Sequence, residues 1–151
     1  MENMLKNYIV QIGADKAQVV LCKKDGSILF DSHYGKRDHF LEVMALIIGS
    51  VSATEQIAKT MSVEKDSDFM MSFANSSHGI FAMPTASSDN IELYVILMFE
   101  NELNPAQFKI KIRKICQYLL ENIKLKENKK NLLFENITDD EIERMFEGCK
   151  V

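Results

Sequence analysis

Residues 38–61 constrain this chain most, because their pattern predicts one long helix that needs two packing surfaces. The segment has no proline and a single glycine. One apolar stripe recurs at the 3.6-residue period of a helix, formed by Phe40, Met44, Ile47, Ile48, Val51 and Ala58. Other faces also carry apolar residues, namely Leu41, Val43, Ala45, Leu46 and Ile57. We expect the first surface to be the domain's own sheet. The second should come from another chain, because 151 residues leave little spare core.

Composition narrows the class of protein. Hydrophobic residues make up 46% of the chain and charged residues 26%, which predicts one globular domain. The net charge of -4 argues against a nucleic-acid partner, which favours a basic surface. No apolar run reaches the roughly 18 residues of a membrane span, so we expect no membrane insertion. Three widely spaced cysteines and the absence of a signal-peptide pattern indicate a cytoplasmic protein.

The remaining pattern predicts an α/β fold of the α+β kind. Residues 1–13 favour a short helix, with a strand through 8–10 as the competitor. A hairpin follows at 17–23 and 28–30, turning at Asp25-Gly26. Asp38 is the expected N-cap of the long helix. Three further strands are expected at 69–74, 80–83 and 91–99, the second ending at Pro84, and a last helix should start at Asn104-Pro105.

The run VVLCKKDGSIL at residues 19–29 resembles the first hairpin of the roadblock family, the dynein-light-chain type of small domain. The long helix and the three following strands match that family in order and length. The resemblance covers residues 1–125 and leaves 126–151 as a C-terminal extension. It implies the order α-β-β-α-β-β-β-α, with a five-stranded antiparallel sheet and a long crossover helix. Longin domains share much of this order but usually begin with a strand; profilin-like and PAS-like sensors are more distant rivals.

The resemblance also implies an association. Roadblock domains pair as homodimers or heterodimers through the long helix and the third strand, and they bind small Ras-like GTPases or serve as scaffolds. We therefore expect a homodimer, with the third strand at the sheet edge of each monomer. Small residues in the middle of the helix would allow close approach. The expected interface comprises Phe40, Met44, Ile47, Ile48, Gly49, Val51, Ala53, Phe69, Met71 and Phe73.

Catalytic, cofactor and metal sites are not expected. His33, His39 and His78 are not clustered with other ligands. The run Asp31-Ser32-His33 holds triad residue types, but neighbours along a strand point to opposite faces. No glycine-rich phosphate loop is present, so the chain is not itself a GTPase. The resemblance agrees, because roadblock domains carry no catalytic constellation.

The C-terminal extension is a candidate docking segment. Residues 104–130 hold eight Lys or Arg and two acidic residues, whereas 135–147 hold six acidic residues and one basic. A capping box at 138–141 predicts a short helix. Its apolar residues Ile137, Ile142, Met145 and Phe146 could dock onto the chain's own basic helix or onto a partner. A solvated, solubilising tail is the simpler alternative.

Three functional classes follow. The first is a non-enzymatic dimeric adaptor or regulator of a small Ras-like GTPase. The second is a scaffold or localisation module that recruits a signalling partner through its acidic tail. A small-molecule sensor is the third, and it would need a closed apolar pocket.

Overall fold

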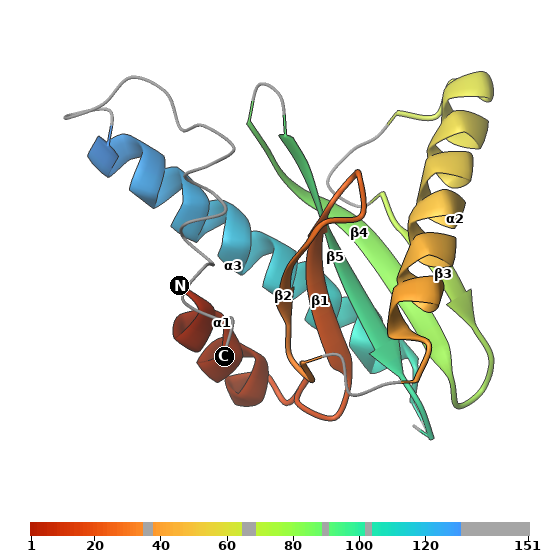
Figure 1. The fold of residues 1–151 in the computed structure, drawn as a ribbon, viewed down its shortest axis with the longest axis horizontal. Coiled ribbons are helices and arrows are strands. Elements are labelled where there is room, and N and C mark those ends of the chain that lie inside the picture. The colour runs from red at the N-terminus through yellow and green to blue at the C-terminus, as the bar shows by residue number, and fades with distance from the viewer. Residues whose placement is uncertain (35–37, 65–68, 89–90, 102–103, 131–151) are drawn as a thin grey trace.

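The computed structural model describes residues 1–34, 38–64, 69–88, 91–101 and 104–130 (Figure 1). The elements in chain order are α1 (Glu2–Gln11), β1 (Gln18–Lys23), β2 (Ile28–Asp31), α2 (Phe40–Thr60), β3 (Met71–Ala74), β4 (Gly79–Ser88), β5 (Ile91–Phe99) and α3 (Ala106–Lys130). This order and the mixed α/β class confirm the sequence prediction. At the N-terminus the structure has the expected helix, α1, and not the alternative strand through residues 8–10.

One five-stranded sheet forms the middle layer, in the order β2-β1-β5-β4-β3. Every neighbouring pair is antiparallel. β5 is central because it is almost continuously apolar, as a strand covered on both faces requires, and its side chains from Leu93 to Phe99 are buried. The two edge strands, β2 and β3, are the shortest strands of the sheet.

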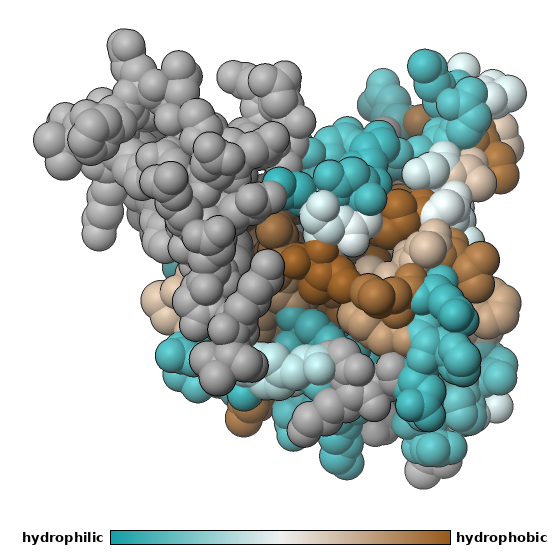
Figure 2. All heavy atoms as spheres, viewed as in Figure 1, coloured by the Kyte–Doolittle hydropathy of each residue, from teal (hydrophilic) through white to brown (hydrophobic). Residues whose placement is uncertain are grey.

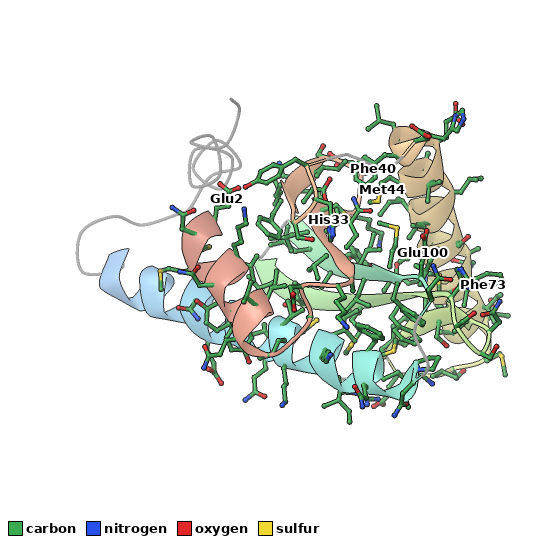
Figure 3. All side chains as sticks on the ribbon, turned by 90° about the horizontal axis from the view of Figure 1, so that it is seen from below. Glu2, His33, Phe40, Met44, Phe73 and Glu100 are labelled. Carbon is green, nitrogen blue, oxygen red and sulfur yellow. The ribbon has the colours of Figure 1, made fainter. Side chains whose placement is uncertain are left out.

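Helices cover the two faces of the sheet unequally. α1 and α3 pack together on one face, and Figure 3 shows α3 running along the lower side of the sheet. Their core uses Leu5 and Ile9 of α1 with the α3 stripe Phe108, Ile112, Ile115, Cys116 and Leu119. Tyr8 and Tyr118 stack with ring centroids 4.2 Å apart and join the two helices. This face carries the larger core.

α2 alone covers the opposite face. Its buried residues Phe40, Met44, Ile47 and Val51 lie on Val20, Cys22, Ala82, Tyr94, Ile96 and Met98 of the sheet. The strand residues alternate with those of the other core, as the period of two demands. A single helix buries only one stripe, so the rest of α2 faces outward.

Several element boundaries differ from the sequence prediction. Asp38 is not the N-cap of α2. His39 is, in a left-handed conformation with φ 55° and without a side-chain capping bond. β3 begins at Met71, so Phe69 precedes the strand.

β4 does not end at Pro84 but continues to Ser88, with an irregular register between Pro84 and Ser87. The reason lies in its neighbours. β3 pairs with β4 only as far as Ala82, so among the described residues no strand pairs with that side of β4 beyond this point. A proline, which lacks an N–H group, is tolerated on such an open side.

The expected domain boundary after residue 125 falls inside α3, which runs on to Lys130. The predicted tail helix and its residues Ile137, Ile142, Met145 and Phe146 lie outside the described residues. Their docking remains a prediction.

Candidate partner interface

The outer face of α2 carries large apolar side chains in the open. Leu41 is 73% exposed, Leu46 72% and Ile57 60%, and Met61, just past the helix, is 69% exposed. Figure 2 shows hydrophobic side chains along α2 at the right of the molecule, interrupted by polar ones. Scattered exposed apolar residues are ordinary, but several on one helix mark a surface that another molecule can cover.

Small residues lie in the middle of this outer face. Gly49 and Ala53 are exposed, and a Cβ atom on Gly49 would meet nothing within 4 Å. The hydroxyl of Ser50 donates to the carbonyl of Leu46 at 2.8 Å, and Thr54 donates to the carbonyl of Ser50 at 2.8 Å. Because these hydroxyls bond within the helix, covering them would leave no donor unsatisfied.

Four residues expected in the dimer interface face the sheet instead. Phe40, Met44, Ile47 and Val51 are at most 9% exposed within this single chain, and Figure 3 shows Phe40 and Met44 pointing from α2 toward the sheet. Their assignment to an interface is corrected, because the regular stripe of an amphipathic helix faces its own core. Ile48 is half-buried beside them.

The exposed apolar residues of α2 are instead those off the stripe. Leu41, Leu46 and Ile57 hold the outward positions. The sequence also places these apolar residues on other faces of the helix, and this part of the pattern indicated the exposed apolar positions. Gly49 and Ala53 keep their expected outward places.

β3 forms one edge of the sheet, as predicted, and among the described residues it pairs with β4. Phe73 is 76% exposed, whereas Met71, on the same strand face, is half-buried against the α2 core. Figure 3 shows Phe73 beside α2. Phe69 is half-buried ahead of the strand. An apolar side chain on an open edge strand favours pairing with another chain.

A polar cluster attaches α2 to the sheet. Lys24, after β1, lies 3.1 Å from Glu55 of α2 and 2.7 Å from Glu92 of β5. The Tyr94 hydroxyl donates to Glu55 and lies 3.2 Å from Glu92. The Glu55 side chain is only 14% exposed, so this bond sits at the margin of the core. The cluster adds a polar attachment to the apolar stripe of α2 and supports the same orientation of the helix.

Burial and these bonds change the acid–base properties of the cluster. Desolvation, followed by the hydrogen bond to Glu55, raises the pKa of Tyr94. The hydrogen bonds to Glu92 and Glu55 raise the pKa of Lys24. Both groups therefore stay protonated at neutral pH, and the cluster acts as a structural tether.

Asp31, Ser32 and His33 do not form a triad, although the reason differs from the expected one. The strand ends at Asp31, so alternation does not apply, and Ser32 Oγ lies 2.9 Å from His33 Nδ1. A triad serine faces Nε2 and leaves Nδ1 to the carboxylate. Here Asp31 Oδ1 accepts the backbone N–H of His33 and the Gln18 amide, both at 2.9 Å. The arrangement stabilises a turn.

No group of three or more His, Cys, Asp or Glu residues that could hold a metal ion occurs in the described ranges. Cys22 and Cys116 are buried, and burial raises the pKa of each thiol to about 12. Their burial indicates a packing role, and the third cysteine, Cys149, lies outside the described residues.

By length and composition, α2 is also the one helix in the described part of the chain that could cross a membrane. Only 22% of its most apolar window is buried. The same helix, however, packs on the sheet through four apolar side chains and the polar cluster. A core helix with one open apolar face passes the same test of length and composition.

Comparison with known proteins places the fold. No protein-family model matches the chain, and no curated protein matches it in sequence. Among solved structures, Myxococcus xanthus MglB is similar, with a TM-score of 0.64 and 15% sequence identity. The match covers 81% of this chain and 94% of that one. At this identity the likeness concerns the fold alone, and in its fold this chain is a roadblock-like domain.

Proposed function

We propose that this chain is a cytoplasmic, non-enzymatic adaptor or regulator that works as a homodimer and binds a small Ras-like GTPase without a cofactor. The observation that carries the proposal is the open apolar face of α2 beside the open edge strand β3. Together they form a surface that a second copy can cover.

Pairing of two α2 helices supports the homodimer. Leu46 and Ile57 would be removed from water, and each such side chain contributes about 1.5–3 kcal/mol when fully buried. Gly49 and Ala53 would let the helix backbones approach closely. β3 would pair with its symmetry mate, which would satisfy the edge of both sheets at once.

The roadblock-like fold supports the choice of a GTPase as partner. A likeness to MglB points to the class of GTPase-associated regulators, and the sequence resemblance to roadblock domains implies the same class of partner.

A pull-down tests this proposal. The full-length protein is immobilised and exposed to extract from its source cell, loaded with GDP or with a non-hydrolysable GTP analogue. We expect enrichment of a Ras-like GTPase that depends on the nucleotide. Enrichment of no GTPase over empty resin, with either nucleotide, would refute the proposal. If other proteins are retained and deletion of 132–151 releases them, the scaffold alternative gains support.

A further inference from the structure

The outer face of α3 carries a second exposed surface, on the side of the molecule away from α2. Phe108, Ile112 and Ile115 point into the core, so the residues between them face outward. Ile110 is 55% exposed at the centre of this outer face. We name the exposed residues Lys109, Ile110, Arg113 and Lys114 the α3 patch.

The α3 patch is basic around an apolar centre. Residues 106–123 of the helix hold four Lys or Arg and one acidic residue, Glu121. The Glu121 carboxylate accepts a hydrogen bond at 3.0 Å from Gln117, one turn away on the same helix. The Lys109 amine lies 5.7 Å from the centre of the Phe81 ring, at the margin of the patch. An acidic segment with apolar side chains would complement this surface in charge and in polarity.

The chain itself supplies such a segment. Residues 131–151, which lie outside the described residues, follow α3 directly and hold six acidic and two basic residues. The apolar residues Ile142, Met145 and Phe146 lie among the acidic ones. The tail therefore combines the two properties that the patch requires.

The length of the tail allows it to reach back. From Lys130 to Ile110 the helix measures about 30 Å at 1.5 Å per residue. Twelve extended residues, from Lys130 to Ile142, span at most about 40 Å. A tethered segment binds at an effective concentration of roughly millimolar, so weak contacts suffice to hold it.

We infer that the acidic tail of each chain docks on its own α3 patch, with apolar tail residues on Ile110 and carboxylates facing Arg113 and Lys114. The docked tail covers the α3 face and leaves the α2 face open. This proposal does not depend on the GTPase or on dimerisation.

Hydrogen exchange of the full chain tests the docking. Amides of 138–147 are expected to exchange about tenfold or more slowly than free coil. Lys114→Glu should lower this protection several-fold. Lys59→Glu is the control, because it makes the same charge change at an exposed lysine of α2 and should leave the protection unchanged. Combining Lys114→Glu with Glu143→Lys should restore part of the protection. Ile110→Ser should reduce it in low and in high salt alike. Coil-like exchange in the unmodified chain, or protection unaffected by both Ile110→Ser and Lys114→Glu, would overturn the proposal.

Zero-length crosslinking distinguishes a tail docked on its own chain from one docked on a neighbour. Equal amounts of ¹⁵N-labelled and unlabelled protein are mixed, and carbodiimide joins lysine amines of α3 to tail carboxylates. Crosslinked peptides of uniform isotope content support docking within one chain. Peptides of mixed isotope content would show that the tail binds a second copy, which contradicts the proposal.

Discussion

At the scale of single residues, two glycines have opposite surroundings. Gly79 lies between its cross-strand neighbours, and a Cβ atom there would come within 2.6 Å of Phe99 Cζ and 2.7 Å of Ala74 Cβ. Gly49 has open space on the outer face of α2. Packing therefore excludes a side chain at Gly79, whereas a single chain has room for one at Gly49.

Substitution by alanine should therefore separate the two glycines. Gly79→Ala should destabilise the fold by about 1–3 kcal/mol through overpacking. Within one chain, Gly49→Ala should stabilise the helix by about 0.5–1 kcal/mol, because alanine loses less backbone entropy. In the proposed dimer the added methyl group would oppose close approach of the helices and reduce this gain. Urea unfolding at one protein concentration measures both. Equal stability of the two variants would show that the β3–β4 hairpin accommodates the extra methyl group.

The buried thiols predict a loss of stability in alkali. The pKa of Cys22 and Cys116 rises from 9.0 to about 12 on burial, so the unfolded chain releases these protons first. Their contribution is complete below pH 9 and declines as the pH rises toward 12, by up to about 1.4 kcal/mol per pH unit for each thiol. Urea unfolding at pH 8 and pH 10 measures this decline.

The double variant Cys22→Ala/Cys116→Ala serves as the comparison. Its stability should fall less between pH 8 and pH 10 than that of the unmodified chain. Some decline should remain, because the pKa values of Lys24 and Tyr94 are also raised. An identical decline in both proteins would assign the alkaline loss to other groups.

At the scale of elements, α2 depends on few attachments. It covers its face of the sheet alone, through one apolar stripe and the tether from Lys24 and Tyr94 to Glu55. α1 and α3, by contrast, support each other on the opposite face. The position of α2 therefore depends on one apolar stripe and on the contacts of Glu55 with Lys24 and Tyr94.

Tyr94→Phe should destabilise the protein by about 1–3 kcal/mol, because Glu55 loses a hydrogen bond while it stays largely buried. Tyr34→Phe is the matched control. Its hydroxyl lies 3.2 Å from the Lys6 amine, but the residue is 55% exposed, so the loss should stay within about 0.5 kcal/mol. Denaturant unfolding compares the two. Similar losses would show that the tether does not hold α2.

At the scale of the whole molecule, the described residues leave α2 half-covered, and the edge strand β3 lies on the neighbouring part of the sheet. The opposite face is closed by two helices that pack on each other. This asymmetry makes the α2 side the one that we propose for association.

Light scattering should find the full-length protein dimeric at micromolar concentration. Leu46→Glu with Ile57→Glu should yield monomers, because two carboxylates would enter an apolar interface. Val10→Glu is the control, since Val10 is 58% exposed on α1, away from α2. A monomeric unmodified protein would refute the interface. Sedimentation of the protein with lipid vesicles, lost in the double variant, would assign the α2 face to a membrane.

Removal of residues 132–151 should leave the domain folded and dimeric, because the described core ends within α3. The change should weaken partner binding or uncover the α3 patch. Circular dichroism and light scattering measure fold and assembly, and the pull-down measures binding. A truncated chain that aggregates would show that the tail belongs to the fold itself.

The sequence by itself determined the order of elements and the class of fold. Local signals were sufficient where one interaction dominates, as in the Asp25-Gly26 hairpin, the apolar run of β5 and the stripe of α3. These patterns depend on neighbours along the chain. The prediction of β3 as an edge strand also held, because it followed from a resemblance in topology.

Only the tertiary structure decided which face of α2 meets the sheet and which meets water. An apolar pattern shows that a residue will be covered, but it does not name the surface that covers it. Phe40 and Leu46 differ little in hydrophobicity, yet the sheet buries the first and leaves the second open. Likewise, β4 continues through Pro84 because β3 begins at Met71, opposite Ala82, and does not extend beside the proline. This depends on strand pairing between distant segments.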